Sequence, residues 1–244
     1  MSTRGRRGMG PGAAEPYDRP VPPDASETRT RLLDAAAAEF AARGVWNASL
    51  IEITRRAGQR NRAALRYHFG SREQVLCAVL DRHTEFLARR EGELLAKALR
   101  TPADDLAAVV EAVVRPAVEL AASGAQGRDC LLIVAELAGE DPARFSPELA
   151  AVLDRTGGNE VYAVLAVRMP PMRSELLAER FGLVTAFILR SVADRARALD
   201  AAGSGHGVAR GSTHSARPQI GDEAFVENLV AMVAASLAAP VPLT

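Results

Sequence analysis

Two short helix signals separated by a glycine turn lie within residues 49–69, and their spacing constrains the fold of the chain most tightly. Ser49 and Glu52 stand three residues apart, as in a capping box, where each side chain satisfies a free amide at a helix start. Gly58 interrupts the helical pattern, and Asn61 is typical of a residue that caps a following helix. The pattern therefore predicts a helix-turn-helix whose second helix is capped by Asn61.

The rest of the chain also carries helical spacing. Leu33, Ala36, Ala37 and Phe40 occupy the i, i+3, i+4 and i+7 positions of one helix face, which predicts a helix over 27–43. Alanine, leucine, arginine and glutamate favour helices, so we expect an all-α fold. Further helices are expected from a second capping box at residue 71 and over residues 101–122, 128–139, 147–168, 174–200 and 222–238.

Two stretches without helical spacing divide the chain. Residues 1–25 are rich in Gly, Pro, Arg and Ala and are expected to form a disordered arm. Residues 202–221 have a similar low-complexity composition and are expected to form a flexible loop. These limits predict a helix-turn-helix domain over 26–72 and a larger helical domain over 73–240.

Charge is balanced over the whole chain but not within the helix-turn-helix. The formal net charge is +0, which excludes a uniformly basic surface. Residues 53–72 nevertheless contain no acid, and they contain six arginines: Arg55, Arg56, Arg60, Arg62, Arg66 and Arg72. This local concentration of positive charge favours DNA as a partner, although a solvated face or a site for an acidic protein has the same composition.

The placement of these charges on two short helices strengthens the DNA interpretation. The second helix of such a pair enters the major groove of double-stranded DNA, while the first crosses the backbone. Arg62 and Arg66 are candidates to contact guanine, the alternative being phosphate contacts alone. Tyr67 and His68 can donate hydrogen bonds to phosphates. Arg72 adds charge at a helix start, where free amides also face an anion.

Other classes of protein find little support in the sequence. Cys77 and Cys130 lie far apart, so we expect two reduced thiols rather than a disulfide framework or a metal site. We find no nucleophile elbow, phosphate-binding loop or metal-ligand cluster, and we expect neither an enzyme nor a bound cofactor. Without a secretory signal or an apolar run of about 20 residues, the chain is expected to be cytoplasmic and to have no membrane partner.

Residues 27–80 resemble the N-terminal domain of the TetR family of bacterial transcriptional repressors. The family's first helix ends in a Phe and a Gly, as in FAARG at 40–44, and its second helix is similar to ASLIEITRRAG at 48–58. Its recognition helix ends in a motif similar to LRYHF at 65–69. The start of its fourth helix is similar to REQVL at 72–76.

The turn between the two short helices departs from the family's pattern. Leu65 follows Gly58 by seven positions, one more than is usual in the family, and Asn61 stands where the family has a capping serine. Taken together, the residues and the resemblance predict these DNA-binding positions: Ser49, Arg60, Asn61, Arg62, Ala64, Arg66, Tyr67, His68 and Arg72.

The resemblance implies a homodimer whose larger domain binds a small molecule and dimerises through its last two long helices. Those helices also have the apolar faces expected of an ordinary core. The expected interface residues are Val184, Phe187, Ile188, Phe225, Leu229, Met232 and Val233. The expected ligand-lining residues, which ordinary core packing also explains, are Leu132, Tyr162, Met172 and Phe181.

The resulting hypothesis is a repressor that binds a palindromic DNA operator as a dimer. An effector would release it by favouring a dimer whose recognition helices are spaced too widely for DNA. One alternative is a transcriptional activator of the same fold. The other is a helical protein-interaction module that does not bind DNA.

Overall fold

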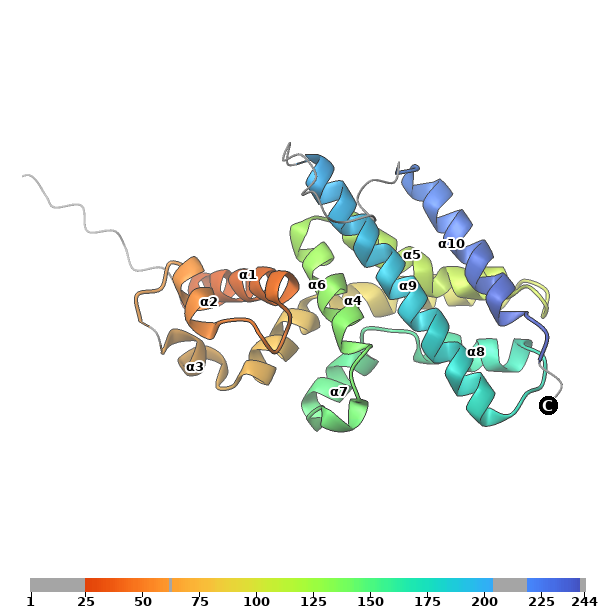
Figure 1. The fold of residues 1–244 in the computed structure, drawn as a ribbon, viewed down its shortest axis with the longest axis horizontal. Helices are drawn as coiled ribbons and strands as arrows, with labels where there is room; N and C mark the ends of the chain where they lie inside the picture. Colours follow the sequence, from red (N-terminus) through yellow and green to blue (C-terminus); the bar gives the residue numbers. More distant parts are fainter. Residues whose placement is uncertain (1–24, 62, 204–218, 242–244) are drawn as a thin grey trace, which may run out of the picture.

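The computed structural model describes residues 25–61, 63–203 and 219–241, and every regular element in these ranges is helical (Figure 1). The all-α prediction is therefore confirmed. The elements are α1 (Ala25–Arg43), α2 (Leu50–Arg56), α3 (Ala64–Phe69), α4 (Arg72–Ala98), α5 (Leu106–Ala122), α6 (Ala125–Leu137), η1 (Pro142–Arg144), α7 (Pro147–Asp154), α8 (Asn159–Arg168), α9 (Ser174–Gly203) and α10 (Asp222–Leu237). None of the described helices is long and apolar enough to cross a membrane.

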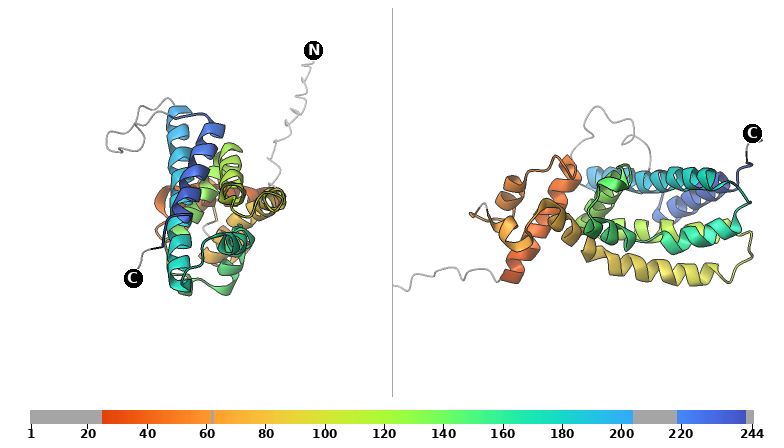
Figure 2. Two further views of the ribbon diagram at one scale, coloured as in Figure 1. Left: turned by 90° about the vertical axis from the view of Figure 1, so that its right-hand side faces the viewer. Right: turned by 90° about the horizontal axis from the view of Figure 1, so that it is seen from below.

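Helices α1 to α3 form one end of the molecule, and the long α4 runs from that end into the larger group formed by α5 to α10 (Figures 1 and 2). Helix α6 packs against both α1 and α9. It therefore joins the small end directly to the larger group. The predicted arm and most of the predicted loop at 202–221 lie outside the described residues.

A shared apolar core holds the small end together. Leu32 and Phe40 of α1 and Ile53 of α2 are fully buried, and Leu65 of α3 is buried in the same cluster. Burying one such side chain stabilises the fold by about 1.5–3 kcal/mol. Helices as short as α2 and α3 are not stable alone in water, so this packing fixes them.

Helix α4 begins with the capping box that the sequence predicts. The hydroxyl of Ser71 accepts the Gln74 amide at 3.2 Å, and the Gln74 side chain accepts the Ser71 amide at 2.9 Å. Two of the free amides at this helix start are therefore satisfied by local side chains. This cap fixes where α4 begins, directly after α3.

Several predicted helices have different limits in the structure, and two of them differ most. The helix expected over 147–168 is two helices, because Gly157 and Gly158 between them adopt φ values of 107° and 101°, which are incompatible with a continuous helix. The helix expected from residue 101 begins at Leu106, where Asp105 accepts the Ala108 amide. Thr101 instead donates its hydroxyl back to the Ala98 carbonyl at the end of α4.

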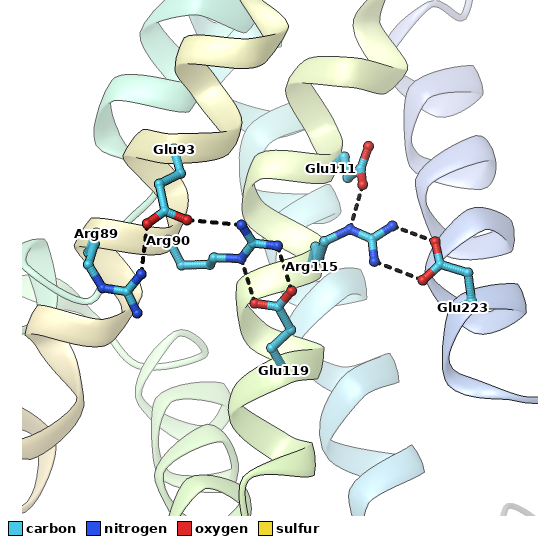
Figure 3. A network of polar contacts seen from close by, with 7 residues as sticks. All are labelled: Arg89, Arg90, Glu93, Glu111, Arg115, Glu119 and Glu223. Atoms are coloured by element: carbon cyan, nitrogen blue, oxygen red, sulfur yellow. Dashed lines mark hydrogen bonds and ion pairs between the residues drawn. The ribbon is translucent and has the colours of Figure 1, made fainter.

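Arginine–carboxylate pairs connect α4, α5 and α10 (Figure 3). Arg90 of α4 donates two hydrogen bonds to Glu119 of α5, at 2.7 and 2.8 Å. Arg115 of α5 donates two to Glu223 of α10, at 2.9 and 2.6 Å, and these bonds lower the pKa of Glu223. The paired geometry orients the helices more than it stabilises them, because Glu223 is exposed and such pairs contribute only about 0–1 kcal/mol.

Two arginines of α9 hold the ends of α10. Arg180 donates to the carbonyls of Leu237 and Ala239 at the C-terminal end, where helix carbonyls have no internal partner. Buried Arg195 donates to the Ile220 carbonyl and to Asp222 at the N-terminal end. Helix α10 is thus attached to α9 at both ends.

Candidate functional site

The first helix of the helix-turn-helix begins at Ser49 as predicted, although only half of the expected capping box forms. The Ser49 hydroxyl accepts the Glu52 amide at 3.3 Å. The Glu52 carboxylate does not return to Ser49 but accepts two hydrogen bonds from Arg55, at 2.9 and 2.7 Å. These bonds lower the pKa of Glu52 and raise that of Arg55. Glu52 therefore neutralises one of the six arginines.

The turn after α2 contains the residue that is extra relative to the family's pattern, and α3 begins later than the sequence predicts. Gly58 has a φ of 71°, a backbone conformation that residues with a side chain rarely adopt. Asn61 does not cap α3: its side chain accepts the Ala63 amide at 2.9 Å, and its carbonyl accepts the Ala64 amide at 3.0 Å. These bonds form a turn of their own before the helix, so the prediction of an Asn61 N-cap is wrong.

Helix α3 exposes one side and buries the other. Leu65 and Phe69 are buried, whereas Arg66 is exposed and Tyr67 is 85% exposed. His68 is half-buried, and its ring meets that of Tyr67 edge-on, with 5.2 Å between ring centroids. The outward residues Arg66 and Tyr67 are therefore available to a partner.

The DNA contact predicted for Ala64 does not fit the structure. Its side chain is only 7% exposed, because α3 packs its first turn into the core of the small end. Arg60 and Asn61, in the preceding turn, are exposed. Arg62 lies outside the described residues, so the contact predicted for it stays a prediction.

Folding reduces the free positive charge of the segment. Arg56 donates to Glu39 of α1 at 3.1 Å, and the Glu39 carboxylate is buried. Arg72 donates to the Val45 carbonyl at 2.8 Å, so part of its guanidinium is already engaged. Among the described arginines of the segment, Arg60 and Arg66 remain without a protein partner. The acid-free stretch in the sequence therefore overstates the charge available to a partner.

One exposed cation near α3 is absent from the predicted set. The guanidinium carbon of Arg29, in the first turns of α1, lies 4.9 Å from the centre of the Phe69 ring. A cation over an aromatic ring is attracted by its electron-rich face. This contact places a positive charge beside the end of α3. The sequence offered only one signal for it, an arginine on the outward side of the predicted first helix.

The predicted dimer residues divide between the core and the surface. Val184, Ile188, Leu229 and Val233 are buried within one protomer, so their placement at an interface is wrong. They face inward because α9 packs on α5 and α6, and α10 packs on α5.

The exposed members of that set are Phe187 and Met232, whereas Phe225 is half-buried under the guanidinium of Arg195. Leu183, which the prediction omitted, is 62% exposed and lies one helical turn before Phe187. Leu199, nearer the end of α9, is also exposed. We call the group Leu183, Phe187 and Met232 the outer apolar face.

A cavity of about 250 Å³ lies inside the larger group of helices. Of the predicted ligand-lining residues, Tyr162 lines it, whereas Leu132, Met172 and Phe181 do not. Phe181 packs behind the Tyr162 ring, with 4.9 Å between ring centroids. Helix α6 supplies much of the wall, with Cys130, Leu131, Val134 and Leu137, and Ala138 directly after the helix also lines it.

Both cysteines are free thiols in the structure. Cys130 is buried in the cavity wall, and burial raises its pKa to about 12. Cys77 is half-buried, and burial raises its pKa as well. Thiols of raised pKa carry little reactive thiolate at neutral pH, so both are expected to be inert.

Comparison with known proteins identifies the family. The model described as "Tetracyclin repressor-like, C-terminal domain" matches residues 111–236, and that described as "Bacterial regulatory proteins, tetR family" matches residues 32–79. The chain therefore belongs to the tetR family of bacterial regulatory proteins.

Individual relatives are similar over a short segment of the chain. The HTH-type transcriptional regulator SrpR of Pseudomonas putida is 47% identical over 57 residues, which cover 23% of this chain and 26% of SrpR. The uncharacterized HTH-type transcriptional regulator TtgW, also of Pseudomonas putida, is 47% identical over 57 residues, which cover 23% of this chain and 42% of TtgW. The chain thus spans less than half the length of either relative.

The fold as a whole is similar to that of solved TetR structures. The structure of the TetR family transcriptional regulator PfmR from Thermus thermophilus matches with a TM-score of 0.50 and 19% identity. The match covers 85% of this chain and 97% of that one. The likeness therefore extends over both the small end and the larger group of helices.

Proposed function

We propose that the protein is a transcriptional repressor that binds a DNA operator as a homodimer and leaves it when a small molecule binds. The observation that carries the proposal is the outward pair Arg66 and Tyr67 on α3, a short helix fixed from behind by buried Leu65 and Phe69. A rigid short helix with exposed donors suits the major groove. Because the proposed partner is DNA, we propose that the protein acts in the bacterial cytoplasm.

The outer apolar face supports a dimer. Leu183, Phe187 and Met232 expose large apolar side chains on two helices that lie side by side. Adjacent exposed apolar side chains on a soluble protein commonly mark an interaction surface. A second copy docked on this face would present two recognition helices, as a palindromic operator requires at a spacing of about 34–36 Å.

Helix α6 supplies a physical connection between the cavity and the DNA-binding end. One side of α6 lines the cavity, and the helix also packs on α1. Near its end, the Glu136 carboxylate accepts the Val45 amide at 2.9 Å, just after α1. A side chain on Gly44 would come within 3.0 Å of that carboxylate, so the glycine permits this close approach.

The peptide groups on either side of Val45 are thus held from two directions. Glu136 of α6 accepts its amide, and Arg72 at the start of α4 donates to its carbonyl. A ligand that displaces α6 would move this attachment and change the orientation of α1 to α3. Release from DNA then requires only that the ligand bind the displaced form more tightly than the DNA-binding form.

Loss of the Glu136 contact is expected to loosen this connection. In Glu136→Ala the Val45 amide loses its acceptor, which is worth about 1 kcal/mol, so its hydrogen exchange should rise about fivefold. DNA affinity should fall several-fold because the small end is less fixed. Hydrogen-exchange mass spectrometry and DNA titration measure the two effects. Glu140→Ala, whose carboxylate pairs with the exposed Arg144, is the control and should change neither.

The proposed DNA binding is tested by its dependence on salt. The DNA used is a duplex selected by the wild-type protein from a random-sequence pool. If each protomer neutralises about three or four phosphates, the logarithm of the association constant should fall with the logarithm of salt concentration at a slope of about −5 to −7. Fluorescence anisotropy measures this slope.

A slope near zero, or no retention of the selected duplex at low salt, would refute DNA binding and favour a protein-interaction module. An activator of the same fold would give the same slope and differ only in the sign of its effect on a reporter gene. The reporter assay therefore separates the two regulatory alternatives.

A further inference from the structure

The cavity has a mostly apolar wall and the size of a small organic ligand. Helices α4, α5, α6, α8 and α9 all contribute side chains to it. An apolar cavity of about 150 Å³ holds one benzene molecule, so this one, at about 250 Å³, has room for an aromatic ring with a short chain. Shape and apolar lining alone do not select among such ligands.

The charges on the wall are all of one sign. Among the described residues that line the cavity, two are acidic, Glu91 and Glu140, and none is a lysine, arginine or histidine. Glu140 accepts a hydrogen bond from Arg144 at 3.2 Å. No described basic side chain forms an ion pair with Glu91. Glu91 is therefore an acidic side chain of the cavity wall that has no basic partner among the described residues.

The structure holds the Glu91 carboxylate at the wall. The Gly158 amide donates to it at 2.6 Å, in the turn between α7 and α8. A side-chain carbon on Gly157 would collide with the carboxylate, so a larger residue there would force Glu91 to shift. Burial raises the pKa of Glu91, which the Gly158 hydrogen bond partly opposes. A cation beside it would relieve the cost of this burial.

An aromatic ring lies close to the same carboxylate. Tyr162 lines the cavity, and a side-chain carbon on Gly158 would lie 3.0 Å from its ring. Gly158 thus separates Glu91 from Tyr162. The Tyr162 hydroxyl is engaged with that of Thr185, and Phe181 packs on its ring, so the ring is fixed in place. A carboxylate beside an aromatic ring is a combination that attracts ammonium groups.

We propose that the cavity binds an apolar organic cation, an amine with an aromatic or aliphatic body, and that Glu91 is its charge partner. The proposal rests on the proposed function, because it specifies the chemistry of the effector. The apolar walls from α5 and α6 receive the body of the ligand, and the ammonium group lies against the Glu91 carboxylate. Because α6 forms part of the wall, occupation of the cavity acts on the helix that contacts Val45.

Three probes of equal carbon skeleton test the charge preference: phenylbutylamine, phenylbutanol and phenylbutyrate. Isothermal titration calorimetry on the full-length dimer measures their affinities. The amine is expected to bind about tenfold more tightly than the alcohol, and the anion most weakly. Equal affinities of amine and alcohol, or no binding of the amine at millimolar concentrations, would overturn the proposal.

Substitution of Glu91 distinguishes a role in binding the ligand's charge from a role in holding the turn. In Glu91→Gln the amide oxygen still accepts the Gly158 amide, and the advantage of the amine over the alcohol should disappear while alcohol binding is unchanged. Equal loss for both probes would show that Glu91 only holds the turn, and would overturn the proposal. Glu93→Gln, on the same helix but paired with exposed Arg89 and with Arg90, is the control.

The same samples separate this inference from the proposed function. Retention of the selected DNA duplex is measured without any probe. DNA retention with no amine preference rejects the organic cation and leaves the repressor intact. Amine preference without DNA retention rejects the repressor and leaves the cation site.

Discussion

Arg66→Ala is expected to weaken binding of the selected DNA duplex by about 10- to 100-fold, because one well-placed arginine–base contact is worth about 1–3 kcal/mol. Arg66 is exposed on α3 and has no protein partner among the described residues, so its guanidinium is free for DNA. Adding Tyr67→Phe removes a hydroxyl that can donate to phosphate and should weaken binding further. Fluorescence anisotropy at fixed salt concentration measures both variants.

Arg55→Ala provides a matched control from the same segment. Arg55 is equally exposed, but Glu52 already neutralises it, and the pair contributes little to stability at the surface. We expect a change in DNA affinity of less than about twofold. A loss as large as that of Arg66→Ala would mean that overall charge, and not the position of Arg66, governs binding. Sedimentation confirms that each variant remains dimeric.

Leu183→Glu is expected to convert the proposed dimer into monomers at micromolar concentration. Leu183 lies in the outer apolar face, and a charge buried there without a partner would raise the dimer dissociation constant by at least about 100-fold. DNA affinity should fall with it, because each monomer contacts one half-site only. Analytical ultracentrifugation and DNA titration measure the two effects.

Val167→Glu controls for the introduction of a charge. Val167 is 86% exposed on α8 and is not part of the outer apolar face, so the variant should stay dimeric and retain its DNA affinity. If Leu183→Glu also stayed dimeric, the outer apolar face would not be the dimer interface. Circular dichroism of both variants checks that the helices remain folded.

The parts of the site that the sequence predicted depend on local signals. Ser49 and Ser71 cap helices through amides three residues away, so their roles follow from spacing alone. The presence of the helix-turn-helix was predictable for the same reason.

The parts that were not predictable depend on distant residues. Arg56 appeared free in its acid-free segment, but the fold brings Glu39 of α1 to it. We predicted that the inward face of α9 forms the dimer interface, because Val184 and Ile188 are as apolar as interface residues. Only the packing of the other helices decides which face of α9 is buried within the protomer. The cavity is likewise formed by several helices, and no single stretch of sequence contains it.

The attachment of α10 to α9 limits where the molecule can change shape. Because Arg180 and Arg195 bind opposite ends of α10, sliding one helix past the other would break charged hydrogen bonds at both ends together. The pair is therefore expected to behave as a rigid frame shared by the two protomers. In the proposed dimer, an adjustment that separates the recognition helices is then expected to arise in α4 and α6, with the α9–α10 pair as the fixed reference.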